Sequence, residues 1–101
     1  MKVIDHEDQS WFLFEHDGTL LLDVNCSHSF VGYTYLIALN DDELAAYEKG
    51  GHEYLSALAH DVHYTAPIVE DSQSPFRGRD LSRQYSELTM EAVRQWRAEL
   101  S

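Results

Sequence analysis

The stretch of residues 11–39 constrains the fold most, because it holds most of the large apolar side chains of this chain. It is typical of three β-strands joined by two tight connections. Asp17-Gly18 stands between two apolar runs, and such a pair is the strongest short-range signal for a two-residue hairpin loop, since both central residues of a type I′ turn need positive φ. We therefore expect a hairpin here, in the register that places Phe14 opposite Leu21.

Alternation along these strands predicts a sheet with two apolar faces. One face collects Trp11, Leu13, Leu20, Leu22 and Val24, whereas the other collects Phe12, Phe14 and Leu21, with His16 and Asp23 at its ends. The polar residues 25–29 are expected to form a connection. Residues 30–39 follow as a strand that is apolar on both sides, which indicates that its second face is also covered.

Two helices are expected after the sheet. Asn40 begins a capping-box pattern that ends at Glu43, and an apolar stripe at helical spacing follows to residue 62. Gly50-Gly51 interrupts it, so either the helix breaks there or Gly51 faces the sheet and permits close packing. We favour one helix, which this pair could kink, with Gly51 on its buried side. The last helix is expected from residue 80 or 82, or only from Thr89.

These elements predict a single α+β domain over residues 1–101. It would contain an antiparallel meander of three or four strands, the fourth being an edge strand at Val3-Ile4, with both helices packed on the face that carries Trp11. A long loop, residues 64–79, precedes the last helix. Since both helices would share one face, the other face would expose an apolar patch larger than a soluble monomer usually shows, so we expect a two-fold homodimer.

Charge narrows the partner classes. The formal net charge is −11, and all five arginines lie after residue 76. We expect no binding to nucleic acid or to an anionic membrane, because both would be repelled by most of the surface, whereas a basic protein partner would be attracted. The amino terminus has no apolar secretory region and Cys26 is the only cysteine, so we expect a cytoplasmic location.

Two residue groups suggest a metal site and a nucleophile site. His60 and His63, with His52 two turns earlier, suggest a metal site, but no complete ligand motif accompanies them, so we expect no metal and no cofactor. Cys26, His28 and Asp23 are the residue types of a cysteine nucleophile site, yet neighbours in one turn rarely converge as nucleophile, base and orienting group.

The stretch from Ser74 to Asp80, called the arginine loop below, is the least ordinary part of the sequence. This loop and the residues that follow it supply our candidate binding residues. These are Phe76, Arg77, Arg79 and Arg83. Arginine just before a helix opposes the helix dipole, and a local rule broken in this way is typical of a functional site. The alternative is that these arginines pair with the acidic remainder of the same domain.

Two function classes remain. The first is a non-catalytic, acidic protein-binding or regulatory domain; in size, acidity and lack of motifs the chain is similar to small bacterial regulatory or toxin-immunity proteins, a likeness of type that covers no specific motif. The alternative is a small enzyme or ligand-binding domain that uses Cys26, His28 and the loop with Arg77 and Arg79.

Overall fold

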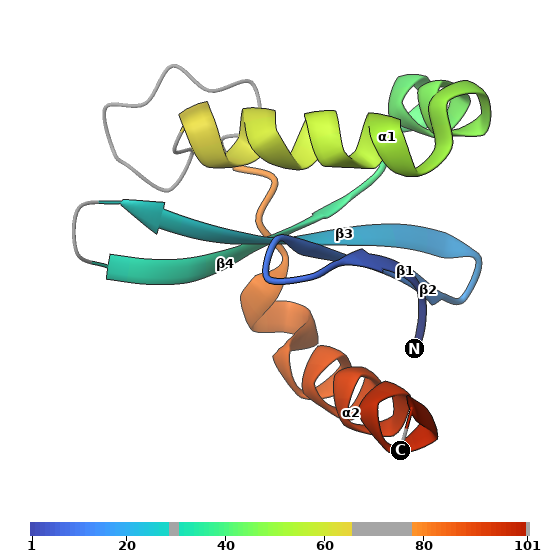
Figure 1. The fold of residues 1–101 in the computed structure, drawn as a ribbon, viewed down its shortest axis with the longest axis vertical. Helices are drawn as coiled ribbons and strands as arrows, with labels where there is room; N and C mark the ends of the chain where they lie inside the picture. The colour runs from blue at the N-terminus through green and yellow to red at the C-terminus, as the bar shows by residue number, and fades with distance from the viewer. Residues whose placement is uncertain (29–30, 66–77, 101) are drawn as a thin grey trace.

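The computed structural model describes residues 1–28, 31–65 and 78–100. Four strands precede two helices: β1 (Lys2–Glu7), β2 (Trp11–His16), β3 (Thr19–His28), β4 (Val31–Ala38), α1 (Asp41–Thr65) and α2 (Ser82–Leu100). The strands form one antiparallel sheet in the order β1-β2-β3-β4 (Figure 1). The chain is therefore an α+β domain built on a four-stranded meander, which confirms the predicted fold class.

The turn between β2 and β3 is the one expected from Asp17-Gly18. Asp17 has a φ of 50° and Gly18 a φ of 80°, the positive values that a type I′ turn requires. Phe14 pairs with Leu21, so the predicted register is confirmed. With that register fixed, alternate side chains of both strands sort onto the two predicted faces.

Strand β1 is longer than the edge strand predicted at Val3-Ile4. It pairs with β2 from Lys2 to Glu7, and the register shifts between Val3 and Asp5. This irregularity leaves Ile4 40% exposed. The extra residue bends the strand locally, as a β-bulge does.

Strand β3 continues to His28, so the predicted connection over residues 25–29 is wrong. Cys26 pairs with Tyr33 of β4, and the alternation of buried and exposed residues persists through Asn25 and Cys26. The prediction failed because it took a polar composition as the end of a strand. A strand tolerates polar residues wherever one of its faces meets solvent.

The two helices lie on opposite faces of the sheet, which corrects the expectation that both pack on one face (Figure 1). Helix α1 packs its buried residues Leu55, Leu58, Ala59 and Val62 on the face that carries Trp11, Leu13, Leu22 and Val24. Helix α2 packs Ala92, Tyr85 and Val93 on Phe14, Leu21 and Leu36, and Leu81, which precedes the helix, joins the same cluster. The physical reason is that both sheet faces are apolar, and one helix on each face removes both from water.

The position of α2 removes the basis of the expected homodimer. Phe14, Leu21 and Leu36 are each no more than 1% exposed in the single chain. The large apolar patch that a second copy was expected to cover is therefore already covered by α2.

Helix α1 begins with the predicted capping box and contains a kink. The Glu43 N–H donates to Asn40 Oδ1 at 2.8 Å, and the Asn40 N–H donates to Glu43 Oε1 at 2.9 Å. Gly51 departs from helical geometry, with φ 57° and ψ −139°. A Cβ on Gly51 would meet no atom within 4 Å. Gly51 therefore permits the kink and makes no close contact with the sheet, contrary to our expectation.

The start of α2 is fastened to β4. The Leu81 N–H donates to the Leu36 carbonyl at 2.7 Å, and the Leu36 N–H donates to Asp80 Oδ1 and to Ser82 Oγ at 3.2 and 3.1 Å. The Ser82 N–H donates to Asp80 Oδ1 at 2.9 Å, which caps the helix. Helix α2 thus begins at Ser82, as one alternative predicted, and these bonds hold its first turn beside the sheet.

Candidate functional site

The arginine loop divides between described and undescribed residues. Phe76 and Arg77 lie outside the residues that the structure describes. Arg79 is part of the folded domain: its two terminal nitrogens donate to Glu43 at 2.9 and 2.6 Å, and Nη2 also donates to the Ala38 carbonyl at 2.7 Å. Arg83 is exposed on the first turn of α2. The structure therefore gives Arg79 the role of an internal ion-pair partner, which was the alternative interpretation.

The ion pair of Arg79 and Glu43 is largely removed from water. The exposed fractions of the two side chains are 26% and 10%. Burial alone would raise the pKa of Glu43, but hydrogen bonds from Arg79 and from the Asn40 N–H outweigh burial and lower this pKa. The pair links the end of β4, the start of α1 and the approach to α2.

Cys26 is not placed as a nucleophile. Its side chain is 3% exposed in the cluster beneath α1, and Sγ donates to the Val24 carbonyl at 3.6 Å. Burial raises the pKa of the Cys26 thiol to about 11, so the reactive thiolate is scarce at neutral pH. Asp23, the neighbouring acid, lies on the opposite face of β3 and lines a groove under α2. The structure does not bring these two groups together.

The histidines do not converge either. His52 is held by carboxylates of β1, with Nδ1 3.0 Å from Asp5 Oδ2 and Nε2 2.7 Å from Glu7 Oε2. His60 stacks on Tyr64 with ring centroids 5.9 Å apart. Within residues 1–28, 31–65 and 78–100, no three histidine, cysteine or acidic side chains are grouped so that they could hold a metal ion.

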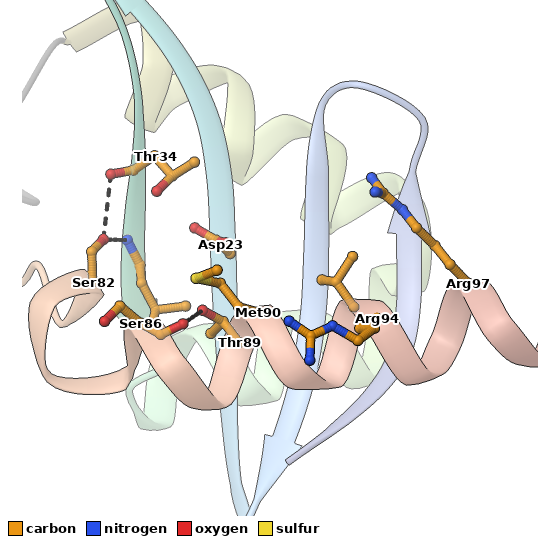
Figure 2. A pocket seen from close by; sticks show the side chains of 10 residues that line it. Asp23, Thr34, Ser82, Ser86, Thr89, Met90, Arg94 and Arg97 are labelled. Atoms are coloured by element: carbon orange, nitrogen blue, oxygen red, sulfur yellow. Dashed lines mark hydrogen bonds between the residues drawn. The ribbon is translucent and has the colours of Figure 1, made fainter.

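A groove lies between the sheet and α2 (Figure 2). Its volume is about 600 Å³. The sheet contributes Asp23, Thr34 and Leu36, and α2 contributes Ser82, Ser86, Thr89, Met90, Val93, Arg94 and Arg97. Volumes of roughly 300–1,000 Å³ are usual for ligand sites.

Asp23 is the unusual residue of this groove. It lies on β3 between Phe12 of β2 and Leu36 of β4, so its neighbours across the sheet are apolar. Its Oδ1 atom is buried and has no hydrogen-bond partner among the described residues. Burial and, to a smaller extent, the nearby Asp80 carboxylate raise the pKa of Asp23 to about 6. Such a carboxylate in a concave site is a functional-site candidate on physical grounds.

The walls around Asp23 combine hydroxyl, apolar and basic groups. Ser82 Oγ donates to the Thr34 carbonyl at 3.3 Å, and Thr89 Oγ1 donates to the Ser86 carbonyl at 3.0 Å (Figure 2). Arg94 at the rim donates to Glu91 at 3.0 Å. The charge of Arg94 is thus balanced beside the groove.

A second hollow adjoins the first. Its volume is about 480 Å³, and it shares Asp23, Thr34, Val93 and Arg97 with the groove. Its remaining lining comes from the β1–β2 region, from Asn25 of β3 and from Trp96, whose ring lies edge-on to Phe12 with centroids 5.3 Å apart. Asp23 therefore lies where the two hollows meet.

Asp23 was considered as a neighbour of Cys26 and His28 and was not among the predicted binding residues. The strand alternation had already placed Asp23 on the same face as Phe12 and Phe14, and an acid on an apolar sheet face was the available signal. What turned that signal into a buried carboxylate is the position of α2, which the local pattern does not specify.

Comparison with known proteins gives no family for this chain. No protein-family model matches it, and neither characterised proteins nor solved structures provide a match. Neither helix among the described residues has the length and apolar character needed to cross a bilayer.

Proposed function

We propose that this chain is a non-catalytic binding domain that holds a protein partner on the face formed by α2 and the adjoining groove. The observation that carries this proposal is the buried, unpartnered Asp23 oxygen at the floor of the groove. A buried polar atom normally has a partner, so this one is incomplete within the described chain. A partner that supplies a donor would complete it.

The surroundings of the groove support a protein rather than only a small ligand. Helix α2 fully buries Ala92 alone, whereas Leu88, Met90 and Leu100 are 40%, 64% and 67% exposed. Met90 lines the groove, and the other exposed apolar side chains of α2 add surface of the kind that the core of a protein interface uses.

The net charge of −11 supports a basic partner. Opposite charge raises the rate at which two proteins meet and disfavours acidic competitors. An acidic regulator or toxin-immunity protein that occupies a basic protein would use charge in this way, and we propose that class for this chain.

A non-catalytic role is favoured by the position of the reactive groups. The Cys26 thiol is buried on the α1 side, and Arg79 is paired with Glu43. Along β4, the partner of Cys26 and the carbonyl that Arg79 binds are five residues apart, Tyr33 to Ala38, which is about 17 Å of strand. Cys26 and Arg79, two groups of the enzyme alternative, are therefore separated.

Paired capture experiments test the binding face. The wild type, Met90→Arg and the control Tyr64→Arg would be immobilised and exposed to lysate of the source cell. Both substitutions place arginine at an exposed apolar position, but Tyr64 lies on α1 and is 82% exposed. We expect one protein to bind wild type and control, and to bind Met90→Arg at least about tenfold more weakly once purified. Equal binding to all three would refute a partner on α2.

A further inference from the structure

The floor of the groove requires a hydrogen-bond donor from outside the described chain. Asp23 Oδ1 is buried and unpartnered, and the apolar Phe12 and Leu36 stand opposite Asp23 on the neighbouring strands. The volume of about 600 Å³ leaves space for an incoming side chain beside it. The group that fills this space should donate hydrogen bonds directly to a carboxylate.

Charge determines which donor is preferred. Burial and, to a smaller extent, Asp80 raise the pKa of Asp23 to about 6, so the carboxylate is mostly ionised at neutral pH. The charged or titratable groups around it come from β1, the β1–β2 connection, the approach to α2 and α2 itself: His6, Asp8, Asp80, Arg94 and Arg97. Arg94 is already bound to Glu91. A cationic donor gains both the hydrogen bond and the charge interaction.

The walls suit a long basic side chain. Leu36, Met90 and Val93 provide apolar surface along the groove. Lysine and arginine bury their methylene stems against such surface while the charged end reaches a polar group. Around the carboxylate, Thr34 and Thr89 supply further oxygen atoms that can accept hydrogen bonds.

We propose that Asp23 receives the ammonium of a lysine or the guanidinium of an arginine from a segment of the partner protein, with the stem of that side chain lying between Leu36, Met90 and Val93. This inference rests on the proposed function and assigns the recognition chemistry of its binding face. The side chain would act as an anchor residue, entering a pocket near the centre of the interface.

Titration of the isotope-labelled 101-residue chain with blocked amino acids tests the inference by NMR. The probes are the N-acetyl N-methylamides of lysine, arginine, norleucine and glutamate. We expect saturable shifts of the Thr34, Leu36 and Val93 amides with lysine and arginine, and at least about tenfold weaker binding of norleucine, which has the same stem without the charge. Because protonation removes the acceptor charge, binding of the lysine probe should weaken as the pH falls through about 6.

Asp23→Asn should abolish the response to the basic probes, and the control Asp61→Asn, at an exposed acid of α1, should leave it unchanged. Equal binding of norleucine, preference for glutamate, no saturable shift with either basic probe, or an unchanged response in Asp23→Asn would each overturn the inference. So would an Asp23 pKa at or below its ordinary value in the free protein, because a group of this chain would then already neutralise it. If Met90→Arg abolishes partner binding while Asp23→Asn does not, the binding face stands and only this inference fails.

Discussion

Replacing Asp23 by asparagine should stabilise the unliganded protein at neutral pH. The folded protein raises the pKa of Asp23 from 3.8 to about 6, through burial first and the Asp80 carboxylate second. The shift is about two pKa units, and each unit corresponds to about 1.4 kcal/mol, so ionised Asp23 lowers the free energy of unfolding by about 3 kcal/mol. Asparagine has the same shape and cannot ionise, so it escapes this penalty.

The sign of the pH dependence follows from proton binding. Between about pH 4 and pH 6 the folded state holds a proton on Asp23 that the unfolded state has released. The stability of the wild type due to this group is therefore greatest below pH 4 and declines as the pH rises through about 6. The advantage of Asp23→Asn should be near its minimum at pH 4 and should grow by about 3 kcal/mol toward pH 7.5.

Urea denaturation of the wild type and Asp23→Asn from pH 4 to pH 8 measures this difference. Any constant effect of the new amide, such as a hydrogen bond it gains or lacks, shifts the whole difference curve without changing its slope. Groups that titrate equally in both proteins cancel in the subtraction. A stability difference independent of pH would refute the reasoning, because it would show that Asp23 is not desolvated in the folded state.

Three further outcomes are expected from other parts of the fold. Arg79→Met should lower the free energy of unfolding by about 3 kcal/mol at pH 7, since it leaves Glu43 buried without its partner. This loss should shrink as the pH falls through the lowered pKa of Glu43. The control Arg83→Ala, at an exposed arginine, should lose little stability in the same urea titration. Hydrogen bonds with Glu7 and then Asp5 raise the pKa of His52. The contribution of protonated His52 to stability should be complete below about pH 6.5 and lost as the pH rises through the folded pKa. His52→Ala should therefore reduce the difference in melting temperature between pH 6 and pH 8. An unchanged difference would show that the contacts of His52 with Asp5 and Glu7 do not stabilise the fold. Gly51→Ala should lower the free energy of unfolding by about 1–3 kcal/mol. The loss comes from the positive φ alone, because the added methyl group meets no atom. Thermal melts that show no loss would indicate that the kink relaxes.

The sequence predicted those features that depend on neighbouring residues. Asp17-Gly18 sets its own turn and thereby the register of β2 with β3, and Asn40 and Glu43 cap α1 from three positions apart. These interactions are local, so the residue types involved are sufficient to indicate them.

The features that sequence reasoning missed depend on tertiary placement. The apolar stripe of a helix does not determine which of two apolar sheet faces the helix covers. The face on which α2 packs could therefore not be predicted from its sequence. The burial of Asp23 follows from that choice. Likewise, a glycine at position 51 is compatible with a close contact to the sheet and with a kink in the helix. Its φ of 57° in the structure shows that the kink is the one that forms.

The bonds that join the start of α2 to β4 also affect how this sheet meets another molecule's sheet. In the order β1-β2-β3-β4 the two outer strands could each template a further strand from a neighbouring chain. At Leu36 of β4, both backbone groups are already taken by residues 80–82. Strand β1 is interrupted by its bulge and carries Asp5 and Glu7, charges that disfavour edge-to-edge growth. The fold therefore opposes amyloid-like polymerisation at both margins of the sheet.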